Sequence, residues 1–283
     1  MAAKRLSVAI PAAFVSDTPH LREKTSKVGM VGRAASIFRV NEIIVYRDSV
    51  ETAQASELDL ISTLLSYMET PQYLRKRLFK LEPQLQYAGI LPPLRTPHHP
   101  LTRTVRELKV GDHREGLVLS KTRDGSLIDI GFDEPALLMG RQFTVDKRLT
   151  LRVTRIGEPV EVAIANSREI KEYWGYTIST ANSLRQVVEN DEWDLRIATS
   201  KKGVQFGRVS KELSSRWKEA TSILIVFGAP TRGLIEIARD EGTRLDEMTD
   251  FVINVVPNQG TETVRTEEAL LVSLAIMNVY FGF

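Results

Sequence analysis

Two loops hold the residues with the greatest capacity to bind a ligand. VFGAPTRGL spans 226–234 and VVPNQGTETVRTEEA spans 255–269, and each begins at the end of an apolar run. Glycines let backbone approach a ligand closely, and the N–H groups that open a following helix are free to bind it. Each loop alone is equally compatible with a plain turn and a helix cap. Together they mark a candidate site without naming its ligand.

Familiar signatures of nucleotide binding and covalent catalysis are missing from the sequence. No G-x-G-x-x-G opens the first strand–helix unit, and no G-x-x-x-x-G-K-[ST] or serine nucleophile elbow occurs. There is no cysteine, which excludes disulfides, thiol catalysis and Cys-ligated metals. The four histidines show no metal-ligand spacing. We expect neither a bound metal nor a Rossmann or P-loop nucleotide site.

The composition indicates a soluble globular protein, and the absence of cysteine is compatible with a reducing cytoplasm, which is the location we expect, or with a hot one. The chain has 283 residues, 42% of them hydrophobic and 26% charged, with a net charge of +2. That balance excludes a polycation that coats nucleic acid but leaves a local basic face open. MAAKRLSVAIPAAF lacks the apolar core of a signal peptide, and no apolar run reaches the roughly 20 residues that a membrane span needs. We therefore expect no membrane association.

Parallel strands are the elements that must position the two loops. Apolar runs predict buried strands, and amphipathic stretches between them predict helices. In an open α/β sheet, ligands bind beyond the carboxyl ends of the strands, which is where both loops fall. The expected strands are RLSVAIPAAF, EIIVYRD, WDLRIATS, SILIVFG and FVINVVP, and the expected helices lie within 16–40, 57–79, 183–190, 210–220, 231–242 and 265–283.

A second kind of pattern interrupts this α/β alternation. Four of the twelve prolines fall between 92 and 100, and short alternating runs with tight turns follow. They predict a small antiparallel β-barrel, in which we interpret DEPALLMG (133–140) as a turn. The economical organisation is one α/β domain formed by 1–92 and 166–283, with a barrel inserted at 93–165.

The start of the expected barrel is basic. From Arg95 to Arg123 there are seven Arg or Lys residues against three acids, together with three of the four histidines. Such a stretch is often no more than a solvated surface. On a small β-barrel, however, a basic face is a common way to hold an RNA backbone.

Over nearly its whole length the sequence resembles a family. The two glycine loops, followed by a terminal helix, are similar to those of the SPOUT class of S-adenosylmethionine-dependent RNA methyltransferases. VAIPAAFVSDTPHLREKTSKVGMVGRAASIFRVNEIIVY is very similar to the N-terminus of an archaeal and eukaryotic SPOUT subfamily with an inserted OB-like domain. The resemblance implies a deep trefoil knot in the parallel-sheet domain, an OB-like inserted barrel, and a homodimer whose active site is completed across the interface.

The resemblance also assigns roles to particular residues. GRAASIFRV matches the first motif of the ribose-methylating branch, and Arg33 stands at its functional arginine. The second and third motifs imply that S-adenosylmethionine binds, and S-adenosylhomocysteine leaves, at Gly228, Pro230, Gly233, Val256, Pro257, Gly260, Val264, Arg265, Thr266 and Ala269. The sequence departs from that branch where Ala-Pro-Thr-Arg replaces an acidic turn and where Thr263-Val264-Arg265 replaces Ser-Leu-Asn.

RNA is the partner that the family implies. If the partner is RNA, several basic positions are candidate RNA contacts, although each could instead be an ordinary solvated surface residue. They are Arg22, Lys24, Arg95, His98, His99, Arg103 and Arg106. The apolar tail LLVSLAIMNVYFGF contains more large side chains than one internal face needs, which favours the homodimer over a tail that only caps the core.

The resulting prediction is an RNA methyltransferase that acts on ribosomal or transfer RNA. Because the branch-specific Asn is absent, we expect methylation of a uridine base at N3 rather than of the ribose 2′-oxygen. Two alternatives stay open: ribose 2′-O-methylation, and an RNA-binding assembly factor that keeps the fold without turnover.

Overall fold

The chain forms two compact units, each assembled from separate stretches of sequence. The computed structural model describes residues 4–49, 53–102, 104–166 and 169–282. The first unit, here called the α/β unit, comprises Met1–Met68, Pro83–Pro93 and Tyr176–Phe283. The second, here called the barrel unit, comprises Glu69–Glu82 and Leu94–Gly175. The chain therefore leaves the α/β unit twice and returns to it twice.

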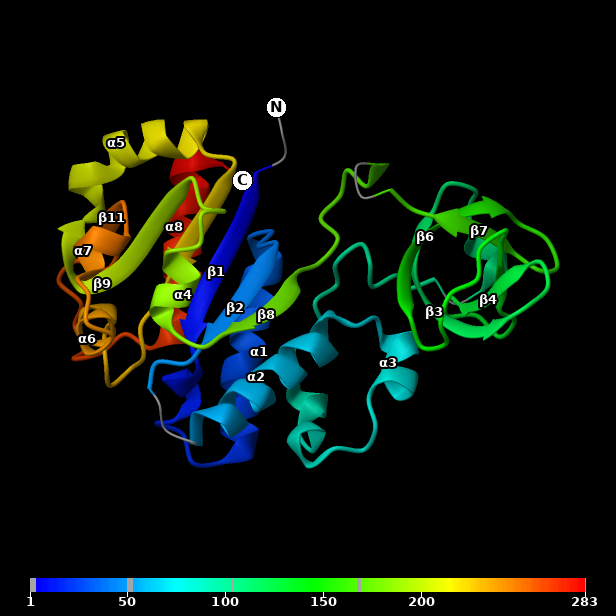
Figure 1. Cartoon of the computed structure of the whole chain (residues 1–283), viewed down its shortest axis with the longest axis horizontal. Coiled ribbons are helices and arrows are strands. Elements are labelled where there is room, and N and C mark those ends of the chain that lie inside the picture. The colour runs from blue at the N-terminus through cyan, green and yellow to red at the C-terminus, as the bar shows by residue number, and fades with distance from the viewer. Residues whose placement is uncertain (1–3, 50–52, 103, 167–168, 283) are drawn as a thin grey trace. The chain divides into compact units, whose positions relative to one another are not determined.

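A six-stranded sheet is the centre of the α/β unit (Figure 1), with strand order β11-β9-β10-β1-β2-β8. Every pairing in it is parallel. The central strands β1, β2 and β10 contain apolar, often β-branched residues that are buried on both faces, as is typical of parallel strands. The bounds of all the strands in this sheet are β1 (Arg5–Pro11), β2 (Glu42–Tyr46), β8 (Thr177–Ala181), β9 (Leu195–Gln205), β10 (Ser222–Val226) and β11 (Phe251–Asn254).

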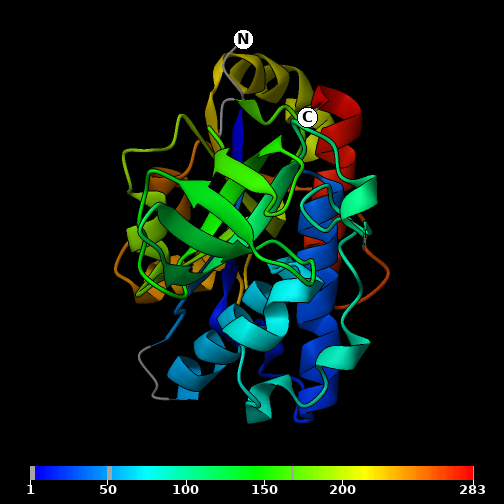
Figure 2. The same ribbon diagram turned by 90° about the vertical axis from the view of Figure 1, so that its right-hand side faces the viewer.

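Helices cover both faces of this sheet. On one face, α4 (Leu184–Val188), α6 (Leu234–Asp240) and α7 (Leu245–Met248) share a buried core with alternate residues of the strands. On the other, α1 (Leu21–Ile37) packs against α8 (Thr266–Phe281), which also contacts α5 (Phe206–Glu219). Figure 2 shows the blue α1 and the red α8 together on one side of β1. The remaining elements are α2 (Ala53–Glu69), η1 (Ala12–Val15), η2 (Pro83–Leu85) and η3 (Ala88–Ile90).

A closed five-stranded barrel forms the other unit, with strand order β3-β4-β5-β7-β6. Alternate side chains point inward and fill the barrel with aliphatic residues, among them Val118, Ile128 and Leu151. Two short helical elements, α3 (Gln72–Leu78) and η4 (Val105–Glu107), belong to the same unit. The strands are β3 (His113–Lys121), β4 (Gly125–Asp129), β5 (Ala136–Met139), β6 (Arg148–Arg155) and β7 (Glu161–Ile164).

The expected α/β architecture with a parallel sheet and a separate β-barrel is confirmed. Two details of the barrel are corrected. DEPALLMG is not only a turn, because Ala136–Met139 forms β5, whose residues Ala136 and Leu138 are buried in the barrel. The barrel is also not wholly antiparallel, since β5 and β7 pair in parallel. A four-residue strand beside two acids and a proline gives too short a pattern to identify from sequence.

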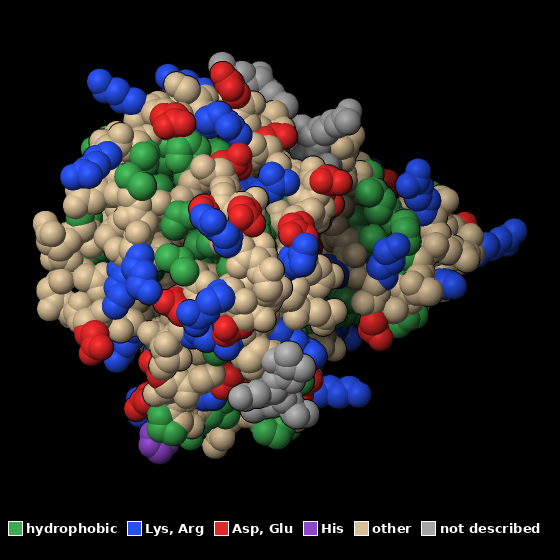
Figure 3. All heavy atoms as spheres, turned by 60° about the vertical axis from the view of Figure 1, so that its left-hand side comes forward, with side chains coloured by type: hydrophobic (Ala, Val, Ile, Leu, Met, Phe, Trp, Pro, Cys, Tyr) green, Lys and Arg blue, Asp and Glu red, His purple; other side chains and the backbone are tan. Residues whose placement is uncertain are grey.

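Charge is distributed evenly on the surface that Figure 3 presents. Lys and Arg side chains there alternate with Asp and Glu, in keeping with the net charge of +2. Among the described residues, no helix combines the length and hydropathy that crossing a membrane would need.

Candidate functional site

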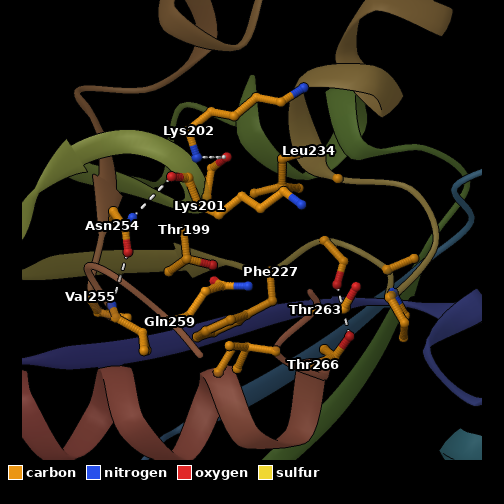
Figure 4. A pocket seen from close by; sticks show the side chains of 18 of the residues that line it. Thr199, Lys201, Lys202, Phe227, Leu234, Asn254, Val255, Gln259, Thr263 and Thr266 are labelled. Carbon is orange, nitrogen blue, oxygen red and sulfur yellow. Dashed lines mark hydrogen bonds between the residues drawn. The ribbon is translucent and has the colours of Figure 1, made fainter. Parts of the chain in front are cut away.

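A pocket of about 360 Å³ opens at the carboxyl ends of β10 and β11 and beside the middle of β9 in the α/β unit (Figure 4). Its volume lies within the range of about 300–1,000 Å³ typical of small-ligand sites. An excursion within β9 and the loops after β10 and β11 line it, and the beginnings of α6 and α8 complete the wall. The position agrees with the general rule that open parallel sheets bind ligands at this edge.

The first loop is an excursion within β9. Ala198 pairs with Val252 of β11, but the next residue of β11, Ile253, pairs with Val204. Thr199–Gly203 therefore leaves the ladder between these strands. Four of its residues, from Thr199 to Lys202, line the pocket, and the Thr199 hydroxyl donates to the Val226 carbonyl over 3.0 Å. Sequence reasoning missed this wall, because the run WDLRIATS indicated only a strand.

The second loop follows β10 and depends on glycine for its shape. A Cβ atom added at Gly228 would lie 2.9 Å from the Leu234 nitrogen and 3.2 Å from the Gly233 Cα, too close to backbone that cannot move aside. Behind it, Phe227 is fully buried, and its carbonyl accepts a 2.7 Å hydrogen bond from the Tyr46 hydroxyl. The close packing at Gly228 and the hydrogen bond to the Phe227 carbonyl therefore both restrict the conformation of the second loop.

The third loop joins β11 to α8. Asn254 braces its start, because its side-chain amide donates to the Lys201 carbonyl and its oxygen accepts from the Val256 nitrogen, both over 2.9 Å. At its other end the hydroxyl of Thr266, 2% exposed, donates to the Gly228 carbonyl over 2.8 Å. One hydrogen bond therefore ties the third loop to the second, as Figure 4 shows.

Charged groups lie at the rim of the pocket. Lys202 and Glu236 form an ion pair of 2.6 Å, and this hydrogen bond from Lys202 holds the pKa of the Glu236 carboxyl below its usual value. Lys201 donates to the Glu262 carbonyl over 3.4 Å. Both lysines come from the β9 excursion, so the rim near β9 combines cations with backbone polar groups.

Seven of the ten residues expected at the cofactor lie around this one pocket: Gly228, Pro230, Gly233, Val256, Val264, Thr266 and Ala269. Pro257, Gly260 and Arg265 belong to the third loop but are not among the lining residues. The lining also includes Leu234, which the second motif keeps. Beyond the β9 excursion, it further includes Phe227, Asn254 and Gln259, which the sequence motifs did not single out.

Arg33 does not line the pocket. It is half-buried on α1, where its Nη1 donates to the Pro93 carbonyl over 3.1 Å. α1 starts at Leu21, close in sequence to the carboxyl end of β1, and Arg33 follows twelve residues later. At about 1.5 Å per residue, that separation is roughly 18 Å along the helix.

The two expected RNA contacts on α1 differ in how far their side chains are exposed to solvent. Arg22 is exposed. Lys24 is mostly covered and forms a 3.0 Å ion pair with Glu57 of α2, with side-chain exposures of 18% and 14%. An RNA phosphate would have to compete with that carboxylate for Lys24.

Of the expected contacts in the barrel unit, Arg95 and Arg106 are exposed, and Arg103 lies outside the described residues. The prediction for His98 is corrected. Its side chain is fully buried, with Nε2 2.9 Å from the Glu69 carbonyl oxygen, so it has no surface to offer RNA. His99 is half-buried, and its Nε2 lies 2.7 Å from the same carbonyl.

Glu69 organises this histidine pair. Burial alone would raise the pKa of its carboxyl, but hydrogen bonds from His98 and Arg148 lower it to about 2. Burial and the neighbouring His98 lower the pKa of His99 to about 4. The pair is therefore part of the internal packing of the barrel unit. Within the described ranges, no group of three or more His, Asp or Glu residues is arranged to hold a metal ion.

Comparison with known proteins supplies the chemistry of the family. Residues 5–277 match the model of a family described as "Putative RNA methyltransferase". The chain is 32% identical to a 28S rRNA (uridine-N(3))-methyltransferase of Drosophila melanogaster, over 96% of the chain and 61% of that protein. It is 31% identical to the protein of the same description from Homo sapiens, over 96% of the chain and 77% of the relative. An uncharacterized protein of Haloarcula marismortui is 32% identical, over 96% of the chain and 98% of the relative. The chain thus spans about three fifths of the fly relative's length.

Proposed function

The chain belongs to the family of RNA methyltransferases whose model it matches, and from this premise we propose that it methylates N3 of a uridine in ribosomal RNA. The observation that supports this choice is the similarity, over 96% of the chain, to two proteins described as 28S rRNA (uridine-N(3))-methyltransferases. We propose that the reaction takes place in the cytoplasm, with S-adenosylmethionine as the methyl donor.

The size and chemistry of the pocket support this choice of donor. Its apolar lining residues include Phe227, Leu234 and Val264, which would suit an adenine ring. Backbone N–H groups of the loop around Gly228 would donate to adenine ring nitrogens, and its C=O groups would accept from the exocyclic amino group. Lys201 would hold the methionine carboxylate at the rim. When bound, the donor supplies a methyl group on a positively charged sulfur, already activated for transfer.

Methylation at N3 also requires the uracil N–H proton to pass to solvent water, so that the ring oxygens take up negative charge until the methyl group is transferred and S-adenosylhomocysteine leaves. Arg33 is suited to that charge, because a guanidinium stays protonated and presents several donors in a fixed fork. It would orient the uracil and stabilise the developing oxyanion. Since Arg33 does not line the pocket of its own chain, we propose that it serves the pocket of a second copy.

A homodimer would bring the second copy into place. Large apolar side chains are exposed on both α1 and α8, which pack together: Met30, Ile37, Leu271, Val279 and Tyr280. Exposed apolar clusters of this kind commonly mark protein interfaces. The resemblance to SPOUT enzymes supports both this dimer and a trefoil knot formed by the second and third loops of the pocket.

RNA binding would draw on both units. We propose that 93–165 is an inserted OB-type module within a domain formed by 1–92 and 166–283. Five strands that close into a small barrel are consistent with that type. Arg22, Lys24, Arg95, His99, Arg103 and Arg106 are the proposed contacts, and Pro257, Gly260 and Arg265 are proposed to shape the third loop around the donor.

The direct test combines purified chain, S-adenosylmethionine and ribosomal RNA from cells that lack the protein, followed by mass spectrometry of nucleosides. We expect N3-methyluridine to appear. A 2′-O-methylated nucleoside would replace the proposal with ribose chemistry. RNA binding without any methylation would instead favour an assembly factor.

Arg33→Lys tests the proposed arginine separately. Lysine keeps the charge but loses the fork, so we expect kcat to fall about 100-fold with binding of the methyl donor unchanged. Arg39→Lys, an exposed position just beyond the end of α1, is the matched control and should behave as the unaltered chain. Full activity of Arg33→Lys would remove Arg33 from the reaction.

A further inference from the structure

The barrel unit contains a second pocket, of about 470 Å³, that the proposed methyl transfer does not use. Its walls come from three stretches of the unit: residues 97–102, the turn into β3 at 111–114, and the segment 169–174. The lining is mostly polar, with Trp174 as its large aromatic side chain. A polar pocket with one broad flat wall is suited to a planar ligand that has hydrogen-bonding edges.

Trp174 is held in place without a ligand. Its indole Nε1 donates to the Glu115 carboxylate over 2.7 Å. The His113 ring, on the same face of β3 as Glu115, meets the Trp174 ring edge to face, with centroids 5.8 Å apart and planes at 75°. The next residue, Gly175, has a φ of +89°, and a Cβ there would lie 2.6 Å from the His98 ring. The indole is therefore a rigid wall.

One buried polar atom beside this wall, Nε2 of His113, lacks a hydrogen-bond partner in the part of the chain that the structure describes. Arg114, the next residue of β3, is 3% exposed and points to the opposite face of the strand, where its guanidinium lies over the Phe132 ring at 4.6 Å. Buried polar atoms normally find partners, so Nε2 of His113 indicates a missing one.

The acidic residues of the pocket limit the charge that a bound ligand can carry. Asp112 accepts from the Lys109 nitrogen over 2.8 Å, and Glu169 lies 3.6 Å from Arg152, so both carboxylates are already engaged. Even so, three acids in the lining would repel phosphate groups. The base of a single nucleotide suits the pocket better, because its N–H groups can donate to carboxylates and its carbonyls can accept from His113.

We propose that this pocket binds one unpaired nucleotide of the RNA substrate, other than the nucleotide that is methylated, with its base stacked on Trp174. Stacking on an aromatic side chain is the common way for proteins to hold single-stranded RNA. His113 contacts the polar edge of the base, and Lys171 lies at the exposed rim. The inference rests on the proposed function only in taking RNA as the substrate.

Tryptophan fluorescence of the full chain, measured without any methyl donor, tests whether a nucleotide stacks on Trp174. Trp193 and Trp217 are 5% and 1% exposed in the α/β unit, so quenching by a short oligouridylate would report on Trp174. We expect quenching in the unaltered chain and its loss in Trp174→Phe. RNA affinity should fall about 5- to 150-fold in Trp174→Ala and much less in Trp174→Phe, which keeps a ring. Arg141→Ala, at an exposed position outside the pocket, controls for general loss of charge.

Two results would overturn the proposal: RNA affinity unchanged in Trp174→Ala, or affinity reduced equally in the Ala and Phe variants of a folded protein. If Trp174→Ala does not fold, photocrosslinking of a 4-thiouridine RNA to the unaltered chain decides. Crosslinks to 97–114 or 169–174 support the pocket, and crosslinks confined to other peptides reject it. Because these readouts need no methyl transfer, a failure of the proposed activity would be seen separately.

Discussion

At the scale of single residues, the pocket of the α/β unit depends on a few hydrogen bonds between loops. Thr266 is the clearest case, because its buried hydroxyl is the donor that connects the start of α8 to the Gly228 carbonyl. Sequence motifs had indicated both loops but not the bond between them. A threonine at the first position of a helix is ordinarily read as part of the cap. Because the hydroxyl of Thr266 is buried and bonds to the distant Gly228, this threonine also connects the second and third loops of the pocket.

Thr266→Val removes that hydroxyl and keeps the shape of the side chain. We expect the unfolding free energy to fall by about 1 kcal/mol and the affinity for S-adenosylmethionine to fall about tenfold, because the two loops lose their connection. Calorimetric titration and thermal melting measure the two effects. Thr249→Val is the matched control: Thr249 is 9% exposed and also donates to a carbonyl, but lies outside the pocket. Equal donor affinities in both variants would contradict the role of Thr266.

His99 makes the stability of the protein sensitive to mild acid. Its native-state pKa of about 4 lies below its usual 6.5, so the unfolded chain binds the proton first. The contribution of neutral His99 to the free energy of unfolding is fully present above pH 6.5 and is lost as the pH falls toward 4. We expect a loss of about 2 kcal/mol between pH 7 and pH 5.

Urea unfolding at the two pH values checks this expectation. His99→Gln keeps a donor for the Glu69 carbonyl and cannot titrate, so its stability should change less between pH 7 and pH 5. The exposed His20→Gln is the control and should retain the full pH dependence. The same dependence in both variants would assign the effect to other groups.

At the scale of elements, the irregular middle of β9 shapes the pocket most. The sequence indicated the strands and both glycine loops, because apolar runs and glycines are local signals. It did not indicate the Thr199–Gly203 excursion, because that feature exists only through the register with β11, about fifty residues later. His98 is a similar case: the charge pattern of 95–123 favoured an exposed face, whereas the fold places this ring on the carbonyl of Glu69.

Gly203→Ala tests the excursion. A Cβ at this position would lie 2.7 Å from the Ile253 carbonyl carbon and 2.8 Å from its nitrogen, so β9 and β11 would have to separate. We expect a loss of about 1–3 kcal/mol in stability together with weaker binding of the methyl donor. Gly207→Ala, in the first turn of α5 with nothing within 4 Å of the added carbon, should be neutral or slightly stabilising. Unaltered donor binding in a folded Gly203→Ala would show that the excursion is not needed for the pocket.

At the scale of the whole molecule, the α/β unit leaves apolar side chains uncovered on α1 and α8. Val279 is 81% exposed and Tyr280 is 60% exposed at the end of the terminal helix. Arg33 lies on the other of these two helices. One association between copies would therefore cover the apolar side chains and bring Arg33 near a second chain.

Val279→Asp tests this association. A carboxylate in an apolar interface would lose its hydration, so we expect light scattering to give the mass of a monomer. Methyl transfer should then fall about 100-fold, as for Arg33→Lys, because each pocket would lose its arginine. Val145→Asp changes a valine that is 53% exposed in the barrel unit and should leave mass and activity unaltered. A dimer that persists in Val279→Asp would place the interface elsewhere.

The order of strands in the sheet has a consequence for how the protein is made. Arg5 in β1 pairs with Ser222 in β10, so the centre of the sheet cannot close until most of the chain has left the ribosome. The barrel strands, from His113 to Ile164, are all synthesised well before that point. Pairings so distant in sequence fold slowly. We therefore expect each nascent chain to contain a finished barrel while its apolar β1 and β2 still lack their other neighbours, β10 and β8. Protection from aggregation matters most in this period.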